Sequence, residues 1–136
     1  MYSSAFLLIF LFLPFLPLII ATDTCCSSAT TVNVDTLITG YIYGSEYVYY
    51  TFELVEGRSY TITMYSAFDN WFDFFAPSQV YLTFGDDQIG KNGVVVYTAT
   101  TTGYYYLRGF SYYADPGSYE LVIADTTSCS HACQST

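Results

Sequence analysis

Apolar and polar residues alternate with a period of two in short runs between Val32 and Ile123. This period predicts β-strands, because successive side chains of a strand point to opposite faces of a sheet. Glycine-, proline- and aspartate-containing stretches such as YGSE, EGRS and ADPGS separate the runs and are turn signals. The alternating runs cover residues 32–34, 48–54, 60–64, 72–74, 80–84, 95–97, 105–107 and 119–123.

No helical period persists in this region. About seven to nine short strands with frequent turns predict an all-β fold, a single antiparallel β-sandwich. One side of each strand should then form the core. The residues expected on that side are Val32, Val34, Val48, Tyr50, Phe52, Leu54, Tyr60, Ile62, Met64, Phe72, Phe74, Val80, Leu82, Phe84, Val95, Tyr97, Tyr105, Leu107, Tyr119, Leu121 and Ile123.

The other side of the strands carries tyrosine and threonine with few charges. In GYYYLRG, for example, Tyr104 and Tyr106 face outward if Tyr105 and Leu107 face inward. A tyrosine-rich sheet face suits contact with something flat, either a sugar ring or a neighbouring subunit. We therefore expect an assembly or ligand face formed by Tyr47, Tyr49, Tyr65, Tyr104, Tyr106 and Arg108.

Residues 1–21 differ in chemistry from the rest of the chain. From Ala5 to Ile20 every side chain is apolar, and Pro14 and Pro17 interrupt the run. The run is close to the about 7–15 apolar residues of a secretory signal and short of the ~20 that span a bilayer as a helix. We expect a signal peptide that is cleaved near Ala21. A retained anchor is the alternative, because the leader has no lysine or arginine.

The cleaved product would be a β-sandwich domain of residues 22–136, secreted to the extracellular space or the cell surface and free of the membrane. Its cysteines lie only near its two ends, at Cys25, Cys26, Cys129 and Cys133. Because a bridge between adjacent cysteines strains the backbone, we expect disulfides that tie one end to the other, in either of two pairings. A zinc site that includes His131 is the alternative, and an oxidising compartment disfavours it.

The acidic charge limits the partners that the domain can have. The chain has 12 acidic and 3 basic residues and a formal net charge of −9. Nucleic acids and anionic membranes require clustered lysine and arginine, so we expect neither as a partner. Oxygen-rich turns could hold calcium, and no other cofactor is required. The candidate calcium ligands are Asp69, Asn70, Asp73, Asp86 and Asp87, although their spacing matches no EF-hand and solvated turn acids are the favoured interpretation.

Catalysis is not expected. The single histidine, His131, lies between two cysteines in CSHAC, where it could not act as a freely oriented base. Adjacent acids such as Asp86 and Asp87 in a glycine-rich turn are more typical of a solvated loop than of a paired acid and base.

The order of the motifs from Leu37 to Asp125 resembles the bacterial pre-peptidase C-terminal domain. The matching stretches are LITGYI, YYTFEL, VEGRSYTITM, WFDFF, TATTTGYYYLR and DPGSYELVI. The resemblance implies a small β-sandwich of the kind found attached to secreted proteases, some members of which bind calcium or collagen-like ligands. The chain departs from the family at Val48, where an acid is usual, and at Trp71, where an Asp-x-Asp pair is usual, which weakens the expectation of calcium.

Two functions from different classes remain. The first is a non-enzymatic structural subunit that assembles with copies of itself into a surface filament or coat, using the tyrosine face and the uncharged edge strand ITGYIYG. The second is a monomeric module that binds a polysaccharide or an extracellular protein and that calcium could assist. We favour the first, because exposed aromatic area is costly in a soluble monomer unless it is covered.

Overall fold

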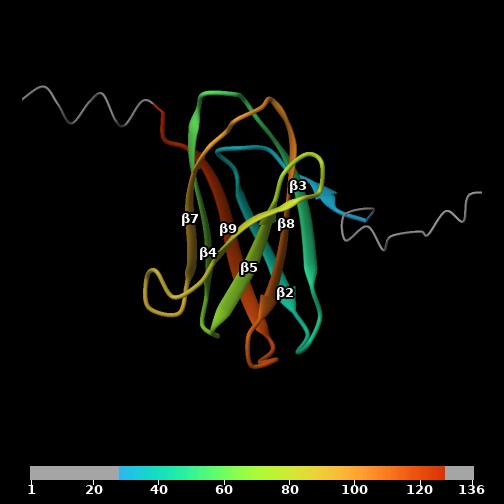
Figure 1. The fold of residues 1–136 in the computed structure, drawn as a ribbon. Helices are drawn as coiled ribbons and strands as arrows, with labels where there is room; N and C mark the ends of the chain where they lie inside the picture. Colours follow the sequence, from blue (N-terminus) through green and yellow to red (C-terminus); the bar gives the residue numbers. More distant parts are fainter. Residues whose placement is uncertain (1–27, 128–136) are drawn as a thin grey trace, which may run out of the picture.

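The computed structural model describes residues 28–127, which form a two-layered sandwich of nine β-strands (Figure 1). The predicted all-β class is therefore confirmed, and no residue of the described range lies in a helix. The strands are β1 (Thr30–Thr31), β2 (Leu37–Ile42), β3 (Val48–Leu54), β4 (Ser59–Ser66), β5 (Asn70–Phe75), β6 (Tyr81–Gly85), β7 (Gly93–Thr98), β8 (Gly103–Ser111) and β9 (Gly117–Asp125).

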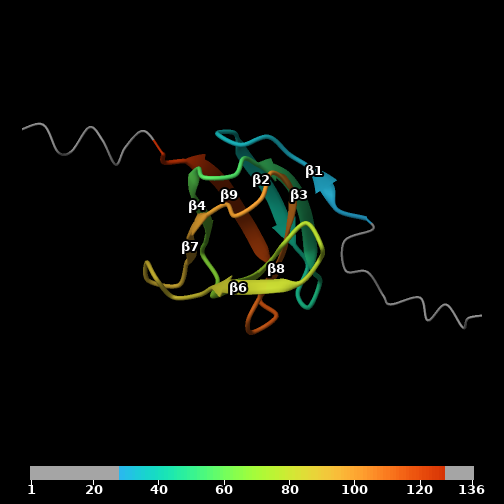
Figure 2. The same ribbon diagram turned by 45° about the horizontal axis from the view of Figure 1, so that its top comes forward.

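The strands divide into a five-stranded and a four-stranded sheet. The first has the order β1-β3-β8-β5-β6, and the second has the order β2-β9-β4-β7. All pairs are antiparallel except β1 with β3, which pair in parallel over two residues. With the top of the molecule turned forward, β1 lies beside β3 at one margin and β6 crosses the opposite side (Figure 2).

The core lies between the two sheets and follows the alternation of the sequence. Nearly all residues expected on the core side are buried or pack against buried neighbours. Phe52 and Phe74 stack between β3 and β5, with ring centroids 6.2 Å apart and an interplanar angle of 4°. The core is thus filled by aromatic rings as well as by aliphatic side chains, which accounts for part of the tyrosine and phenylalanine content.

One hydrogen bond joins the two sheets inside this core. The hydroxyl groups of Tyr50 on β3 and Tyr119 on β9 lie 2.5 Å apart, and both residues are buried. The Tyr119 ring lies over Gly40 of β2, where an added Cβ would come 2.3 Å from the phenol oxygen. The glycine of LITGYI is therefore required by the tyrosine of GSYELVI, its register partner.

Two residues of the expected core face solvent instead. Val80 lies before β6 and is exposed, and Phe84 within β6 is 45% exposed. The register between β5 and β6 shifts by one residue between Phe74 and Phe75, so that the alternation in β6 is broken at this β-bulge. Gly85 faces the core in place of Phe84. The ring of Phe72 fills the space that a side chain at position 85 would occupy.

The uncharged ITGYIYG segment was expected to form an edge strand, and it does so as β2. β2 ends the four-stranded sheet and pairs only with β9, so one side of β2 is without a strand partner among the described residues. β7 forms the other edge of that sheet, and β1 and β6 form the edges of the five-stranded sheet.

The expected signal peptide and the four cysteines lie outside residues 28–127, so their predictions stay predictions. Within those residues, no helix is long and apolar enough to cross a membrane.

Candidate functional site

The outer side of the five-stranded sheet carries a continuous group of aromatic side chains, which we call the aromatic face. It arises because the residues between the core positions of β3, β8 and β5 all point outward. The register places Tyr49 beside Arg108, Arg108 beside Asp73, and Trp71 beside Phe110. The aromatic face consists of Tyr47, Tyr49, Trp71, Phe75, Tyr81, Phe84, Tyr104, Tyr106, Phe110 and Tyr112, together with the ion pair of Asp73 and Arg108.

The rings of the aromatic face contact one another. Trp71 stacks on Phe84 with centroids 4.4 Å apart and an interplanar angle of 13°, and on Phe110 at 6.3 Å and 29°. Phe110 in turn meets the ring of Tyr47 edge-on at 5.2 Å, and Tyr47 lies 6.3 Å from Tyr49. Such contacts add about 0.5–1.5 kcal/mol each beyond the area that they bury. The same contacts cover the flat faces of these rings, so that ring edges and hydroxyl groups remain free to contact a partner.

An ion pair neutralises the centre of this face. The Arg108 Nε and Nη2 atoms donate to Asp73 Oδ2 at 3.0 and 2.6 Å, and Trp71 Nε1 donates to Asp73 Oδ1 at 3.0 Å. The Arg108 guanidinium carbon lies 5.3 Å from the Tyr47 ring centroid and 5.7 Å from that of Phe75. Burial lowers the pKa of Arg108, but the hydrogen bond and the charge of Asp73 outweigh it and raise the pKa above its ordinary value. Arg108 is therefore a fixed cation rather than a free surface charge.

Much of the aromatic face is open to solvent. Tyr47, Tyr104 and Tyr81 are about half exposed, at 51%, 50% and 49%, and Tyr112 is 56% exposed. The five-stranded sheet therefore presents a broad apolar surface, with the unpaired Glu53 at the margin opposite Tyr104. Continuous apolar surfaces of this kind mark sites of contact with other molecules.

Three carboxylates gather at one end of the aromatic face. One oxygen from each of Asp69, Asp86 and Asp87 lies within 4.8 Å of the others. With Trp71 and two tyrosines they line a cleft of about 230 Å³. Burial, and then the charges of Asp87 and Asp69, raise the pKa of Asp86. Oxygen ligands in this arrangement suit a hard divalent cation.

The other two candidate calcium ligands do not join this cluster. Asn70 is fully buried, and its amide donates to the Ser66 hydroxyl and accepts from the Gly93 backbone N–H at 2.9 Å. Both oxygens of Asp73 are taken by Trp71 and Arg108. Asn70 thus fastens the β4–β5 turn to the start of β7, and Asp73 belongs to the aromatic face.

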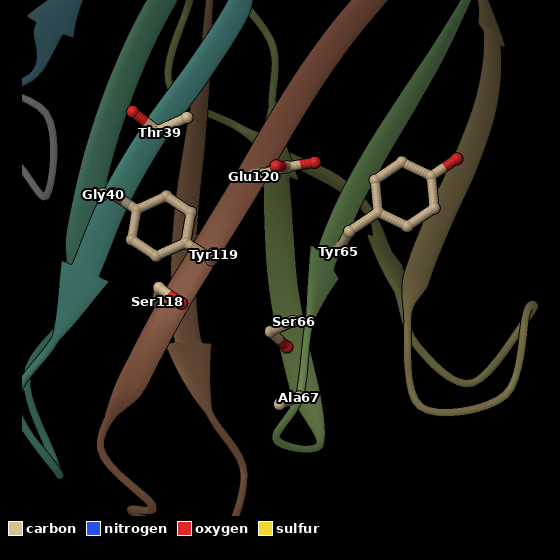
Figure 3. Close-up of a pocket in the computed structure, with 8 residues that line it drawn as sticks. All are labelled: Thr39, Gly40, Tyr65, Ser66, Ala67, Ser118, Tyr119 and Glu120. Atoms are coloured by element: carbon tan, nitrogen blue, oxygen red, sulfur yellow. The ribbon is translucent and has the colours of Figure 1, made fainter.

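The structure separates Tyr65 from the other predicted face residues. Five of them, Tyr47, Tyr49, Tyr104, Tyr106 and Arg108, lie together on the aromatic face. Tyr65 lies on β4 of the four-stranded sheet and points outward on the opposite side of the sandwich. It borders a groove of about 340 Å³, which Figure 3 shows between β2, β9 and β4.

Sequence reasoning missed several members of the aromatic face. Phe110 could have been found, because it follows Arg108 by two residues on the outward side of the same strand. Phe84 could not, because the β-bulge that turns it outward has no signal in the alternation. The contribution of Tyr112 depends on the packing of the β8–β9 turn against Trp71.

The sequence matches no protein-family model and no curated protein. Solved structures do match the fold. The pre-peptidase C-terminal domain of the collagenase from Bacillus anthracis superposes with a TM-score of 0.62 and 24% identity, over 70% of this chain and 93% of that chain. PliG from Aeromonas hydrophila, a periplasmic inhibitor of g-type lysozyme, superposes with a TM-score of 0.54 and 20% identity, over 70% and 96%. The chain therefore has the fold of the pre-peptidase C-terminal domain, as the order of its motifs predicted.

Proposed function

We propose that this protein is a non-enzymatic extracellular structural subunit that assembles with copies of itself through the aromatic face. The observation that carries the proposal is the extent of that face. Ten outward aromatic residues surround one neutralised ion pair, and five of them are exposed, namely Tyr47, Tyr81, Phe84, Tyr104 and Tyr112. Exposed aromatic area of this kind is costly for a soluble monomer, and burying it against a second copy removes the cost.

Charge supports a copy of the same chain as the partner. At a net charge of −9, copies repel one another unless they meet through a surface that carries little charge. The aromatic face is such a surface, because Arg108 and Asp73 neutralise each other within it. Two copies can then bury the centre of this face about a two-fold axis without placing an unpaired acid inside the contact.

The orientation of the rings favours protein over sugar at this surface. A sugar ring stacks on an open aromatic face, whereas Trp71 has Phe84 and Phe110 packed against it. Ring edges and tyrosine hydroxyl groups are typical of the contact between protein surfaces, where tyrosine and tryptophan are enriched.

A filament or coat needs a second contact, since a single two-fold contact closes into a dimer. The free edge of β2 supplies a candidate. This strand has six residues without charge or proline, and its Leu37 and Tyr41 are 56% and 47% exposed. Natural edge strands usually carry such protective residues, because an open edge pairs readily with another strand.

The absence of catalysis and the extracellular location are also part of the proposal. The matched part of the collagenase is its pre-peptidase C-terminal domain, and PliG is named as a periplasmic inhibitor of an enzyme. In residues 28–127 there is no histidine. These observations support a surface that binds rather than a centre that reacts.

Calcium is the cation that we propose for Asp69, Asp86 and Asp87. The cluster lies at the end of the aromatic face beside Trp71, so a bound ion would remove three like charges from the margin of the contact. Calcium then strengthens assembly without being needed for the fold.

The test is the mass distribution of the secreted protein by light scattering, with negative-stain imaging, in calcium and in chelator. We expect ordered assemblies in the parent protein. Substituting Tyr47→Ala and Tyr104→Ala removes two half-exposed rings, each worth about 2 kcal/mol on burial, and should weaken assembly more than tenfold. Tyr65→Ala, an equivalent change on the opposite sheet, is the control and should leave assembly intact.

A monomer in both solutions at high concentration would overturn self-assembly. The monomeric module that binds an extracellular protein or a polysaccharide through the same face would then become the account to pursue.

A further inference from the structure

The groove on the four-stranded sheet has a chemistry different from that of the aromatic face. Three outward residues lie in register across three adjacent strands, Thr39 on β2, Glu120 on β9 and Tyr65 on β4. Ser118 precedes Glu120 by two residues and therefore shares its face. Figure 3 shows these side chains around the groove, with Glu120 directed across β9 toward β4.

The binding groups of the groove are free to meet a ligand. Within residues 28–127, Glu120 forms no ion pair, and neither its carboxylate nor the hydroxyl groups of Thr39 and Ser118 form a hydrogen bond. The Tyr65 ring is 41% exposed and contacts no other aromatic ring of the described chain. In this respect Tyr65 differs from Trp71 on the aromatic face, whose ring faces are occupied.

The backbone that forms the floor of the groove is supported by buried side chains on its core side. Gly40 has no side chain, and the phenol of Tyr119 lies where its Cβ would be. The hydroxyl group of Tyr119 is fixed in turn by Tyr50 of the other sheet. A preformed floor lowers the cost of ordering the site when a ligand binds.

We propose that this groove binds a neutral saccharide. A sugar ring has an apolar face and an edge of hydroxyl groups, and the groove offers an open aromatic ring beside three oxygen-bearing side chains. The apolar face of the sugar packs on Tyr65, and neighbouring sugar hydroxyl groups donate to the carboxylate of Glu120, which accepts charge-assisted hydrogen bonds. Thr39 and Ser118 each donate to or accept from a further hydroxyl group.

Size and charge restrict the ligand further. A volume of about 340 Å³ is near the lower end of ligand sites, which span about 300–1,000 Å³, and suits one or two sugar units. Acidic sugars are excluded, because Glu120 is the only charge of the groove and the whole chain carries −9. This site is separate from the aromatic face, since it lies on the other sheet.

The test is a binding screen of the full secreted chain against immobilised neutral oligosaccharides of glucose, mannose and N-acetylglucosamine. Heparin and a lysine-rich peptide serve as acidic and cationic probes. Titration calorimetry then measures the affinity of the best saccharide, and the amide NMR spectrum shows which residues it perturbs. We expect binding to a neutral saccharide, with the largest shifts at Thr39, Ser118, Glu120 and Tyr65.

The variants separate this site from the aromatic face. Glu120→Gln keeps the shape of the side chain, and we expect it to weaken saccharide binding at least tenfold, as should Tyr65→Ala. Tyr104→Ala, on the opposite sheet, should leave saccharide binding unchanged although it weakens assembly. The proposal is wrong if no neutral saccharide binds, if only heparin or the peptide binds, or if Glu120→Gln binds the saccharide as well as the parent protein.

Discussion

The hydrogen bond between Tyr50 and Tyr119 gives a direct test of how the two sheets are held together. Each hydroxyl group has only the other as its partner among the described residues, and the oxygens lie 2.5 Å apart in the core. Substitution of either tyrosine by phenylalanine removes one hydroxyl group and leaves the other buried without a partner. Substitution of both removes the polar groups altogether while the rings stay in place.

The magnitudes follow from this geometry. A buried polar group without a partner costs about 1–3 kcal/mol, whereas replacing both partners by apolar groups is nearly neutral. We expect Tyr50→Phe and Tyr119→Phe each to lower the free energy of unfolding by about 1–3 kcal/mol. The double variant should lie close to the parent protein, so the two changes should be strongly non-additive.

Urea unfolding followed by the fluorescence of Trp71, the only tryptophan, measures these differences. For a small domain with a slope of about 1–1.5 kcal/mol per molar urea, a loss of about 1–3 kcal/mol should lower the midpoint of each single variant by about 0.7–3 M. A double variant as destabilised as the sum of the two single variants would refute the reasoning, because the hydroxyl groups would then not be satisfying each other.

The same pair predicts a change of stability with pH. Burial, followed by the hydrogen bond with Tyr50, raises the pKa of Tyr119 well above its ordinary value. The folded protein therefore keeps the Tyr119 proton at pH values where the unfolded chain, with a tyrosine pKa of about 10, has lost it. The stability from this group is complete below about pH 10 and falls as the pH rises further. Tyr119→Phe should remove that part of the decline.

Three other changes test separate parts of the account. Gly40→Ala places a methyl group within 2.3 Å of the Tyr119 phenol oxygen and should destabilise the fold by about 1–3 kcal/mol in the same urea assay. Asp73→Asn leaves the partly exposed Arg108 without its counter-charge, and we expect a loss of about 1–2 kcal/mol, less than for a fully buried pair. Asp86→Asn should weaken calcium binding at least tenfold by calorimetry. In the parent protein that affinity should fall as the pH drops toward the raised pKa of Asp86, because protons compete for the same carboxylate.

The alternation of apolar and polar residues along the sequence predicts most of the fold. β8 and β9 have buried and more exposed residues where the period of two places them, because regular pairing on both sides preserves the alternation. β6 departs from this pattern, because it is an edge strand and can accommodate a bulge opposite Phe74 and Phe75. The inward position that the alternation gives to Phe84 is lost at that bulge.

The candidate sites were predictable only in part, because a strand pattern says which side a residue faces and not which sheet carries it. Tyr65 and Tyr104 have the same outward pattern, yet β4 and β8 belong to different sheets. Likewise, Asp73 and Asp86 are both acids near turns, but the register of β5 with β8 pairs the first with Arg108. These assignments depend on long-range pairing, which the local sequence does not encode.

The most direct test of the central claim is the solvent protection of individual tyrosines, measured by hydroxyl-radical footprinting of concentrated and dilute protein. If copies meet through the aromatic face, Tyr47 and Tyr104 should be protected at high concentration and modified at low concentration. Tyr65, on the opposite sheet, should be modified equally in both. Equal modification of Tyr47 and Tyr104 at the two concentrations, in samples that scattering shows to be assembled, would contradict the account and place the contact elsewhere.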